Sequence, residues 1–174
     1  MSDPERVLVR LPNWLGDVLM ARPLLFALRG AFPRAVVRCV GPAGPMELLR
    51  GDGTAAEWLA WPEDDRGRGE RVAGLRRWRP DAALVLPPSF SSAWFARRTG
   101  ARRRIGYRGE LRGPLLTSAP ARPPRGDRHL AEEYLALGGE LGAELYALFL
   151  RVARHLHRSG RGDFSATRWR DGAC

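Results

Sequence analysis

The chain has 174 residues, of which 44% are apolar, so it can bury the core of one α/β domain and is not expected to be globally disordered. Its formal net charge is +10, and every one of its 29 basic residues is arginine. No run of 18 apolar residues occurs and the N-terminus is not typical of a signal peptide, so we expect a cytoplasmic protein without a membrane-spanning helix.

Two windows contain the whole excess of positive charge. Residues 97–112 hold seven arginines and one glutamate, and residues 151–174 hold six arginines and two aspartates. One interpretation is a basic patch that binds an anion such as a phosphate, a sugar acid or a nucleic acid. The other is a composition that uses arginine for every solvated basic position, which explains the absence of lysine but not the clustering in 97–112. The two cysteines, Cys39 and Cys174, fit no metal or disulfide spacing.

Short apolar runs alternate with stretches of helical periodicity along the chain. Predicted strands are 6–11, 35–40, 57–61, 82–86 and 104–107. Predicted helices are 17–31, 46–50, 70–78, 90–98 and 129–141, with a surface loop at 63–69. We expect one domain over residues 1–142. Residues 143–174 form an atypical arginine-rich segment, with a candidate helix at 144–156 and no periodicity after it.

The alternation predicts a parallel sheet with helices on both faces, a Rossmann-like α/β fold. Ligands of such sheets bind beyond the carboxyl ends of the strands, where the loops after Leu11 and Leu86 are expected. The first of these loops contains a single glycine, Gly16, rather than the three spaced glycines of a dinucleotide site. A nicotinamide-dependent dehydrogenase is therefore disfavoured.

The first loop, residues 11–17, reads Leu-Pro-Asn-Trp-Leu-Gly-Asp. Gly16 allows a ligand to approach the backbone, and Asp17 lies at the first turn of the next helix. Asp17 could act as a general base toward a bound hydroxyl. On spacing alone an ordinary helix N-cap is the favoured interpretation, because aspartate is a preferred capping residue.

The second loop, residues 86–93, gathers three hydroxyl side chains where a strand turns into a helix. Ser89, Ser91 and Ser92 could form a cradle for a sugar or a phosphate. The alternative is that one of these serines simply caps the helix.

A third segment, residues 103–110, lies inside the basic window. Arg104 and Arg108 suit bidentate binding of carboxylates or phosphates. The alternative is a solvated edge strand whose charges prevent aggregation.

Taken together, these segments resemble glycosyltransferase family 9. Residues 10–25 (RLPNWLGDVLMARPLL) are similar to the N-terminal motif of that family. Residues 89–93, 104–110, 115–116, and His129-Leu130 with Tyr134 are similar to later motifs of its lipopolysaccharide heptosyltransferases. The resemblance covers about residues 6–142 and departs from the family pattern at Pro88 and Ser91, where asparagine and lysine are common.

The resemblance implies a GT-B fold of two Rossmann-like domains with no metal or other cofactor. The N-terminal domain would receive the lipopolysaccharide core, and the C-terminal domain would bind the donor ADP-heptose. Asp17 would be the general base of an inverting transfer. The implied substrate-binding residues are Asn13, Trp14, Gly16, Ser89, Ser91, Ser92, Arg104 and Arg108. Anionic groups of the acceptor would match the basic window.

A chain of 174 residues is too short for two such domains of about 150 residues each. We therefore expect the acceptor-side, N-terminal half without the donor domain. The alternatives are a non-catalytic domain that binds a phosphosugar or the acceptor, and one half of a split enzyme. A nucleic-acid partner is not expected, whereas peripheral contact with the cytoplasmic face of the inner membrane is compatible with such an acceptor.

Overall fold

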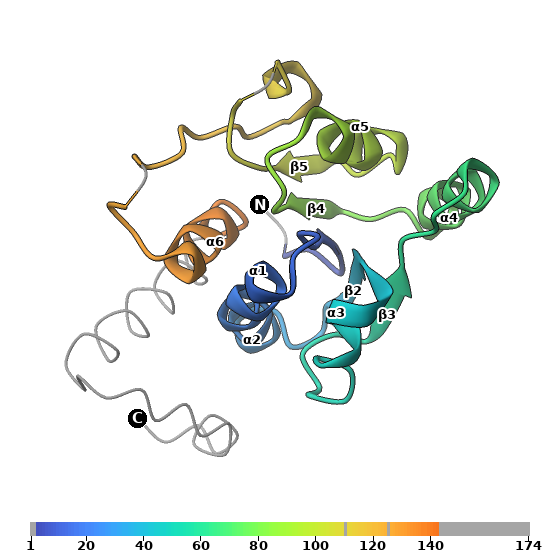
Figure 1. The fold of residues 1–174 in the computed structure, drawn as a ribbon, viewed down its shortest axis with the longest axis horizontal. Coiled ribbons are helices and arrows are strands. Elements are labelled where there is room, and N and C mark those ends of the chain that lie inside the picture. Colours follow the sequence, from blue (N-terminus) through green and yellow to red (C-terminus); the bar gives the residue numbers. More distant parts are fainter. Residues whose placement is uncertain (1–2, 110, 125, 143–174) are drawn as a thin grey trace.

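A computed structural model describes residues 3–109, 111–124 and 126–142. Its sheet has the strand order β3-β2-β1-β4-β5, and all four strand pairs are parallel (Figure 1). The strands are β1 (Arg6–Arg10), β2 (Val36–Gly41), β3 (Glu57–Ala60), β4 (Ala82–Val85) and β5 (Arg103–Ile105). The helices are α1 (Leu15–Met20), α2 (Arg22–Ala31), α3 (Ala43–Glu47), α4 (Asp65–Trp78), α5 (Phe90–Arg98), the short 3-10 helix η1 (Gly113–Leu115) and α6 (Leu130–Gly139).

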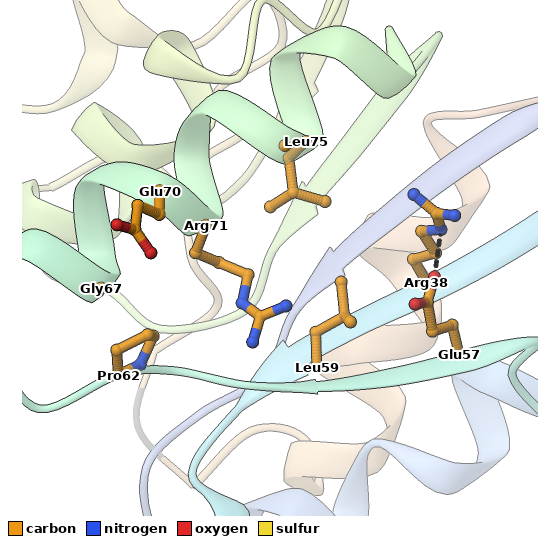
Figure 2. Close-up of a pocket in the computed structure, with 9 residues that line it drawn as sticks. Arg38, Glu57, Leu59, Pro62, Gly67, Glu70, Arg71 and Leu75 are labelled. Carbon is orange, nitrogen blue, oxygen red and sulfur yellow. Dashed lines mark ion pairs between the residues drawn. The ribbon is translucent and has the colours of Figure 1, made fainter.

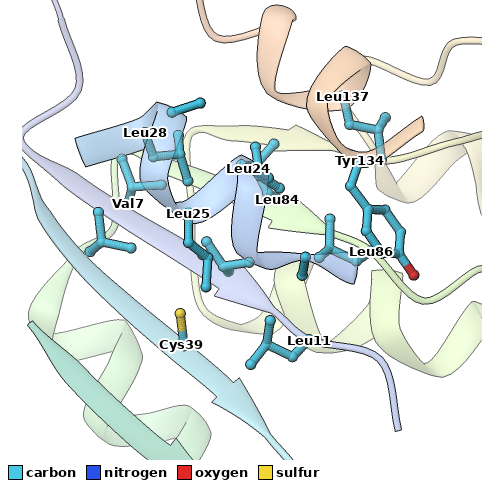
Figure 3. Close-up of a cluster of buried hydrophobic side chains, with 14 of the residues drawn as sticks. Val7, Leu11, Leu24, Leu25, Leu28, Cys39, Leu84, Leu86, Tyr134 and Leu137 are labelled. Carbon is cyan, nitrogen blue, oxygen red and sulfur yellow. The ribbon is translucent and has the colours of Figure 1, made fainter. Parts of the chain in front are cut away.

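Both faces of the sheet are buried under helices. Val7 and Val9 of β1 point into a cluster with side chains from α1, α2 and α6, part of which is drawn in Figure 3. Leu8, between them, points into a second cluster with side chains from α4 and α5. Because neither face is solvated here, β4 and the centre of β1 are apolar without alternation. The predicted fold class, a Rossmann-like parallel sheet covered on both faces, is confirmed.

Two predicted elements were wrong. The expected surface loop at 63–69 is mostly helix, because the Asp64 carboxylate accepts a hydrogen bond from the Gly67 amide at 2.7 Å and starts α4 at Asp65. The single helix expected over 17–31 is divided into α1 and α2. Pro23 has no N–H to continue the helical ladder, so the chain breaks just before it, at Ala21.

Residues 143–174 lie outside the described residues. The candidate helix at 144–156, the arginine-rich segment after it and the domain boundary near Gly142 therefore stay predictions. No helix in the described part of the chain is long and apolar enough to cross a membrane.

The order in which strands are added to the sheet reverses at β1, the central strand. From β1 the chain adds β2 and β3 on one side, and it then crosses over to add β4 and β5 on the other side. The amide of Leu86, just after β4, donates to the Arg10 carbonyl at the end of β1 at 3.1 Å. The loops that follow these strands therefore start side by side and then diverge. In open α/β sheets this switch point is where a ligand binds.

Candidate functional site

Asp17 lies at this switch point but does not cap its helix. The N-cap of α1 is Trp14, no side chain makes a capping hydrogen bond there, and Asp17 is the third residue of the helix. The capping interpretation of Asp17 is therefore wrong. Its half-buried carboxylate stays in the first turn, where the helix dipole favours a negative charge. Within the described ranges, no hydrogen bond or ion pair involves this carboxylate.

Arg10, at the carboxyl end of β1, holds the loop that leads to Asp17. Its Nη2 donates to Oδ1 of Asn13 at 3.2 Å, and its Nη1 donates to the carbonyls of Leu11 and Val40. The guanidinium also lies 5.6 Å from the ring centroid of Trp61. Burial lowers the pKa of Arg10 to about 10, so the group is still a cation at neutral pH. Asn13 is thus fixed by a cation, while the neighbouring Trp14 side chain is 78% exposed.

The serine loop after β4 is built as a helix cap. Ser89 is the N-cap of α5, and its hydroxyl accepts from the Ser92 amide at 3.4 Å. Ser92 is buried, and its hydroxyl donates to the carbonyls of Ser89 at 2.9 Å and Pro87 at 3.3 Å. Ser91 is exposed, with its hydroxyl 3.1 Å from that of Ser89. The capping interpretation is confirmed for Ser89, and Ser91 is the most open of the three hydroxyls.

A fully buried arginine, Arg112, holds this loop through hydrogen bonds to its main-chain carbonyls. The Arg112 guanidinium donates to the carbonyls of Val85, Pro87 and Ser89, the first and last at 3.4 and 3.3 Å. It passes over Gly106, where an added Cβ would collide with Arg112 and would lie only 3.0 Å from the Val85 carbonyl. Gly106 therefore has a packing role.

The arginines of β5 do not face the site. Arg103 donates to the carbonyl of Leu141 at 2.9 Å and so ties down the end of α6. Arg104 donates to the carbonyls of Ala101 and Leu115, each at 2.7 Å. Burial and the nearby charge of Arg97 lower the pKa of Arg104. Arg97 lies in the last turn of α5, about 12 Å along the helix from Ser89, so Arg104 is far from the serine loop.

The basic window 97–112 is therefore not a single anion-binding surface. Arg97 and Arg98 lie at the far end of α5, and only Arg108 and Arg112 belong to the loops at the ligand edge. Arg108 is exposed, and its Nε donates to a main-chain carbonyl at 3.2 Å. The sequence interpretation of one local basic patch is corrected, because the strand β5 divides the window between opposite edges of the sheet.

Neither of two surface cavities contains a predicted site residue. A groove of about 380 Å³ lies between β3 and α4, and the Arg38–Glu57 ion pair of 2.5 Å closes one end of it (Figure 2). It is lined by Arg38, Glu57, Leu59, Pro62, Gly67, Glu70, Arg71, Gly74 and Leu75. A second cavity of about 570 Å³ lies between α6 and the segment 120–128. The candidate site is instead the open edge between the loops after β1 and β4.

Sequence reasoning selected neither Arg10 nor Arg112 as a site residue, and it named Tyr134 only as part of the family resemblance. A charged residue in a strand that is otherwise apolar marks the end of that strand, and this signal could have identified Arg10. No sequence signal separates Arg112 from the solvated arginines around it. Tyr134 is buried on α6 and reaches the same edge (Figure 3).

Comparison with known proteins supports the family resemblance seen in the sequence. Residues 71–150 match glycosyltransferase family 9 (heptosyltransferase). The chain is 32% identical over 145 residues to lipopolysaccharide heptosyltransferase 2 of Escherichia coli K12, a match that covers 79% of the chain. The solved structure of Escherichia coli ADP-heptose lps heptosyltransferase II matches 76% of the chain and 40% of its own length, with a TM-score of 0.68 at 32% identity.

A more distant structure shares the fold alone. The glycosyl transferase family 9 structure from Veillonella parvula has a TM-score of 0.68 at 22% identity, and the match covers 80% of this chain and 42% of that one. The chain spans about two fifths (41%) of the length of the Escherichia coli relative.

Proposed function

This chain belongs to glycosyltransferase family 9, and on that premise we propose that it forms the acceptor side of a heptosyltransferase. The proposed reaction transfers heptose from ADP-heptose to the inner core of lipopolysaccharide. The solved relative is named for ADP-heptose and lps, which supports this choice of donor and acceptor.

One observation carries the proposal: the Asp17 carboxylate lies at the switch point without being used as a cap. Family resemblance alone leaves a capping role open, because aspartate is a common N-cap. In this fold Trp14 occupies the capping position, and Asp17 leaves a half-buried carboxylate without a hydrogen bond or ion pair among the described residues at the ligand edge. The helix dipole favours a negative charge there, and such an available carboxylate also suits a general base beside a bound hydroxyl.

In the proposed step, Asp17 removes the proton of an acceptor hydroxyl while that oxygen attacks the anomeric carbon of the donor. The bond from the anomeric carbon to the diphosphate breaks, and ADP leaves with the bonding electrons. Attack from the face opposite ADP inverts the anomeric centre. In this proposal the indole of Trp14 and the hydroxyl of Ser91, both exposed, would contact the acceptor sugar.

Asp17→Asn tests the base in an enzyme completed by fusing the donor-binding domain of a family 9 relative after about Gly142. Asparagine keeps the shape but is not basic, so we expect turnover to fall roughly 10²–10⁴-fold. Because Asp17 makes no capping bond, the free energy of unfolding should change by less than about 1 kcal/mol. The measurements are ADP release in the presence of a lipopolysaccharide core acceptor, and urea denaturation.

Asp65→Asn is the matched control, because Asp65 is also an acidic residue in the first turn of a helix, on α4. It should leave turnover unchanged. Near-normal turnover in Asp17→Asn would mean that the base lies elsewhere. Acceptor binding without any ADP release by the fused enzyme that carries the unaltered chain would make the chain a binding domain and not part of a transferase.

A further inference from the structure

The groove between β3 and α4 contains an arginine whose guanidinium has no partner among the described residues. Arg71 extends from α4 toward β3, and its guanidinium lies in the groove near Pro62 and Leu59 (Figure 2). Its Nε atom is shielded from solvent and donates no hydrogen bond, and no described carboxylate forms an ion pair with it. A buried donor without an acceptor is costly, and native structures rarely leave one unsatisfied. Arg71 therefore needs an acceptor that this part of the chain does not provide.

The other charged side chains that line the groove are already paired. The Glu57 carboxylate lies 2.5 Å from Nε of Arg38, and the Glu70 carboxylate lies 3.1 Å from Nε of Arg66, one turn earlier on α4. Neither carboxylate is left over to neutralise Arg71. Within the described part of the chain, the groove therefore presents one positive charge that has no counterion.

Apolar side chains lie next to this charge. Leu59 of β3 and Leu75 of α4 line the groove together with Pro62 (Figure 2). Gly74 belongs to the same lining, and nothing lies within 4 Å of a Cβ added there, so no side chain fills this part of the groove. The volume of about 380 Å³ suits a small organic ligand. The groove is separate from the candidate site, because none of its lining residues belongs to the loops after β1 and β4.

We propose that this groove binds a small apolar carboxylate, with the carboxylate on the Arg71 guanidinium and the apolar body against Leu59 and Leu75. A planar carboxylate accepts two parallel hydrogen bonds from a guanidinium, so it also satisfies the buried Nε. A phosphate dianion suits the groove less well, because the carboxylates of Glu57 and Glu70 line the same space and repel a second negative charge. This inference is independent of the proposed heptose transfer, since it concerns a different surface of the domain.

The first test titrates the full chain with benzoate and follows the backbone amide signals of its glycines by NMR. The signals of Gly67 and Gly74, which line the groove, should shift and saturate, whereas that of Gly16 at the candidate site should stay in place. Benzamide has the same ring without the charge, acetate has the charge without the ring, and inorganic phosphate carries more charge. All three should bind more weakly than benzoate. The absence of saturable shifts at Gly67 and Gly74, or equal binding of benzamide or phosphate, would overturn the inference.

The second test removes the charge. Arg71→Met keeps the apolar stem and should weaken benzoate binding about tenfold or more, the effect of losing hydrogen bonds to a charged group. Arg77→Met is the matched control, because Arg77 is an exposed arginine of α4 outside the groove, and it should bind benzoate normally. Unchanged affinity in Arg71→Met would overturn the role of Arg71.

The third test fills the groove and leaves Arg71 intact. Leucine is a better helix former than glycine, so Gly74→Leu should fold and should abolish the benzoate shifts by occupying the space. Gly69→Leu is its control, because Gly69 also lies in α4 with nothing within 4 Å of an added Cβ but does not line the groove. Normal benzoate binding by Gly74→Leu would place the ligand elsewhere and overturn the inference.

Discussion

Several arginine side chains among the described residues hold main-chain carbonyls. Arg10, Arg103, Arg104 and Arg112 all donate to backbone carbonyls, and Arg10, Arg103 and Arg104 form no ion pair with another described residue. A guanidinium offers five donors in a rigid fork, so one side chain can hold several carbonyls that no strand or helix satisfies. These four arginines thus serve loop structure, and net charge alone is a poor guide to the ligands of the protein.

Tyr107 should make stability depend on alkaline pH. Burial, and secondly Glu133, raise the pKa of Tyr107 to about 12, although Arg128 and Arg122 act in the opposite direction. Below about pH 10 both the folded and the unfolded chain keep the phenol proton, and the contribution of Tyr107 to the free energy of unfolding is fully present. Between about pH 10 and 12 the unfolded chain loses that proton first, so stability falls as pH rises.

Tyr107→Phe removes this titration. The variant should therefore lose less stability than the unaltered chain between about pH 9 and about pH 11, as measured by urea denaturation at each pH. At neutral pH it should be less stable by about 1 kcal/mol, because its bond to the Glu133 carbonyl is gone. Equal alkaline losses in the two proteins would show that Tyr107 titrates normally in the folded state.

At the scale of elements, the loop between β4 and α5 depends on a contact that the sequence does not reveal. Arg112 can reach the carbonyls of Val85 and Ser89 only because Gly106 has no side chain. Gly106→Ala should displace the guanidinium and destabilise the protein by about 1–3 kcal/mol. The measurement is the free energy of unfolding in urea.

Gly74→Ala is the matched control for Gly106→Ala. Gly74 is inside α4, and nothing lies within 4 Å of its added Cβ. The same substitution there should stabilise the protein by up to about 1 kcal/mol, because alanine is the better helix former. A neutral Gly106→Ala would show that Arg112 can leave its position without cost.

The periodicity of apolar residues predicted a helix or strand correctly where the local preference of the residues and their packing in the fold favour the same structure. The helix expected at 90–98 is α5 without change, since Ser89 both caps it and ends the preceding loop. The prediction failed where a single residue decides the structure against the preference of the residues around it. Gly67 and Gly69 favour a loop, but the cap from Asp64 starts the helix before them. Pro23 was included within a continuous helix although it must interrupt the ladder.

The candidate site is a property of the whole molecule, because its two loops are distant in sequence. Sequence alone could place Asp17 and Ser89 at the ends of strands. It could not show that β1 and β4 are neighbours, which the strand order provides. The same limit applies to Tyr134, whose helix α6 comes last among the described elements and packs back onto α1. Family resemblance identified these segments, whereas topology explains why they meet.

Strand order also predicts how stability is distributed. β1 is paired on both sides and buried throughout its centre, so its amides at Val7–Val9 should exchange hydrogen most slowly, near the limit of global unfolding. β3 and β5 are the edge strands. All residues of β3 are only half-buried, whereas β5 is tied to α6 through Arg103, so β3 should open before β5. Native-state hydrogen exchange followed by NMR measures each strand. Arg103→Met should bring β5 to the fast exchange of β3 without affecting β1, and uniform exchange across the sheet would contradict this ranking.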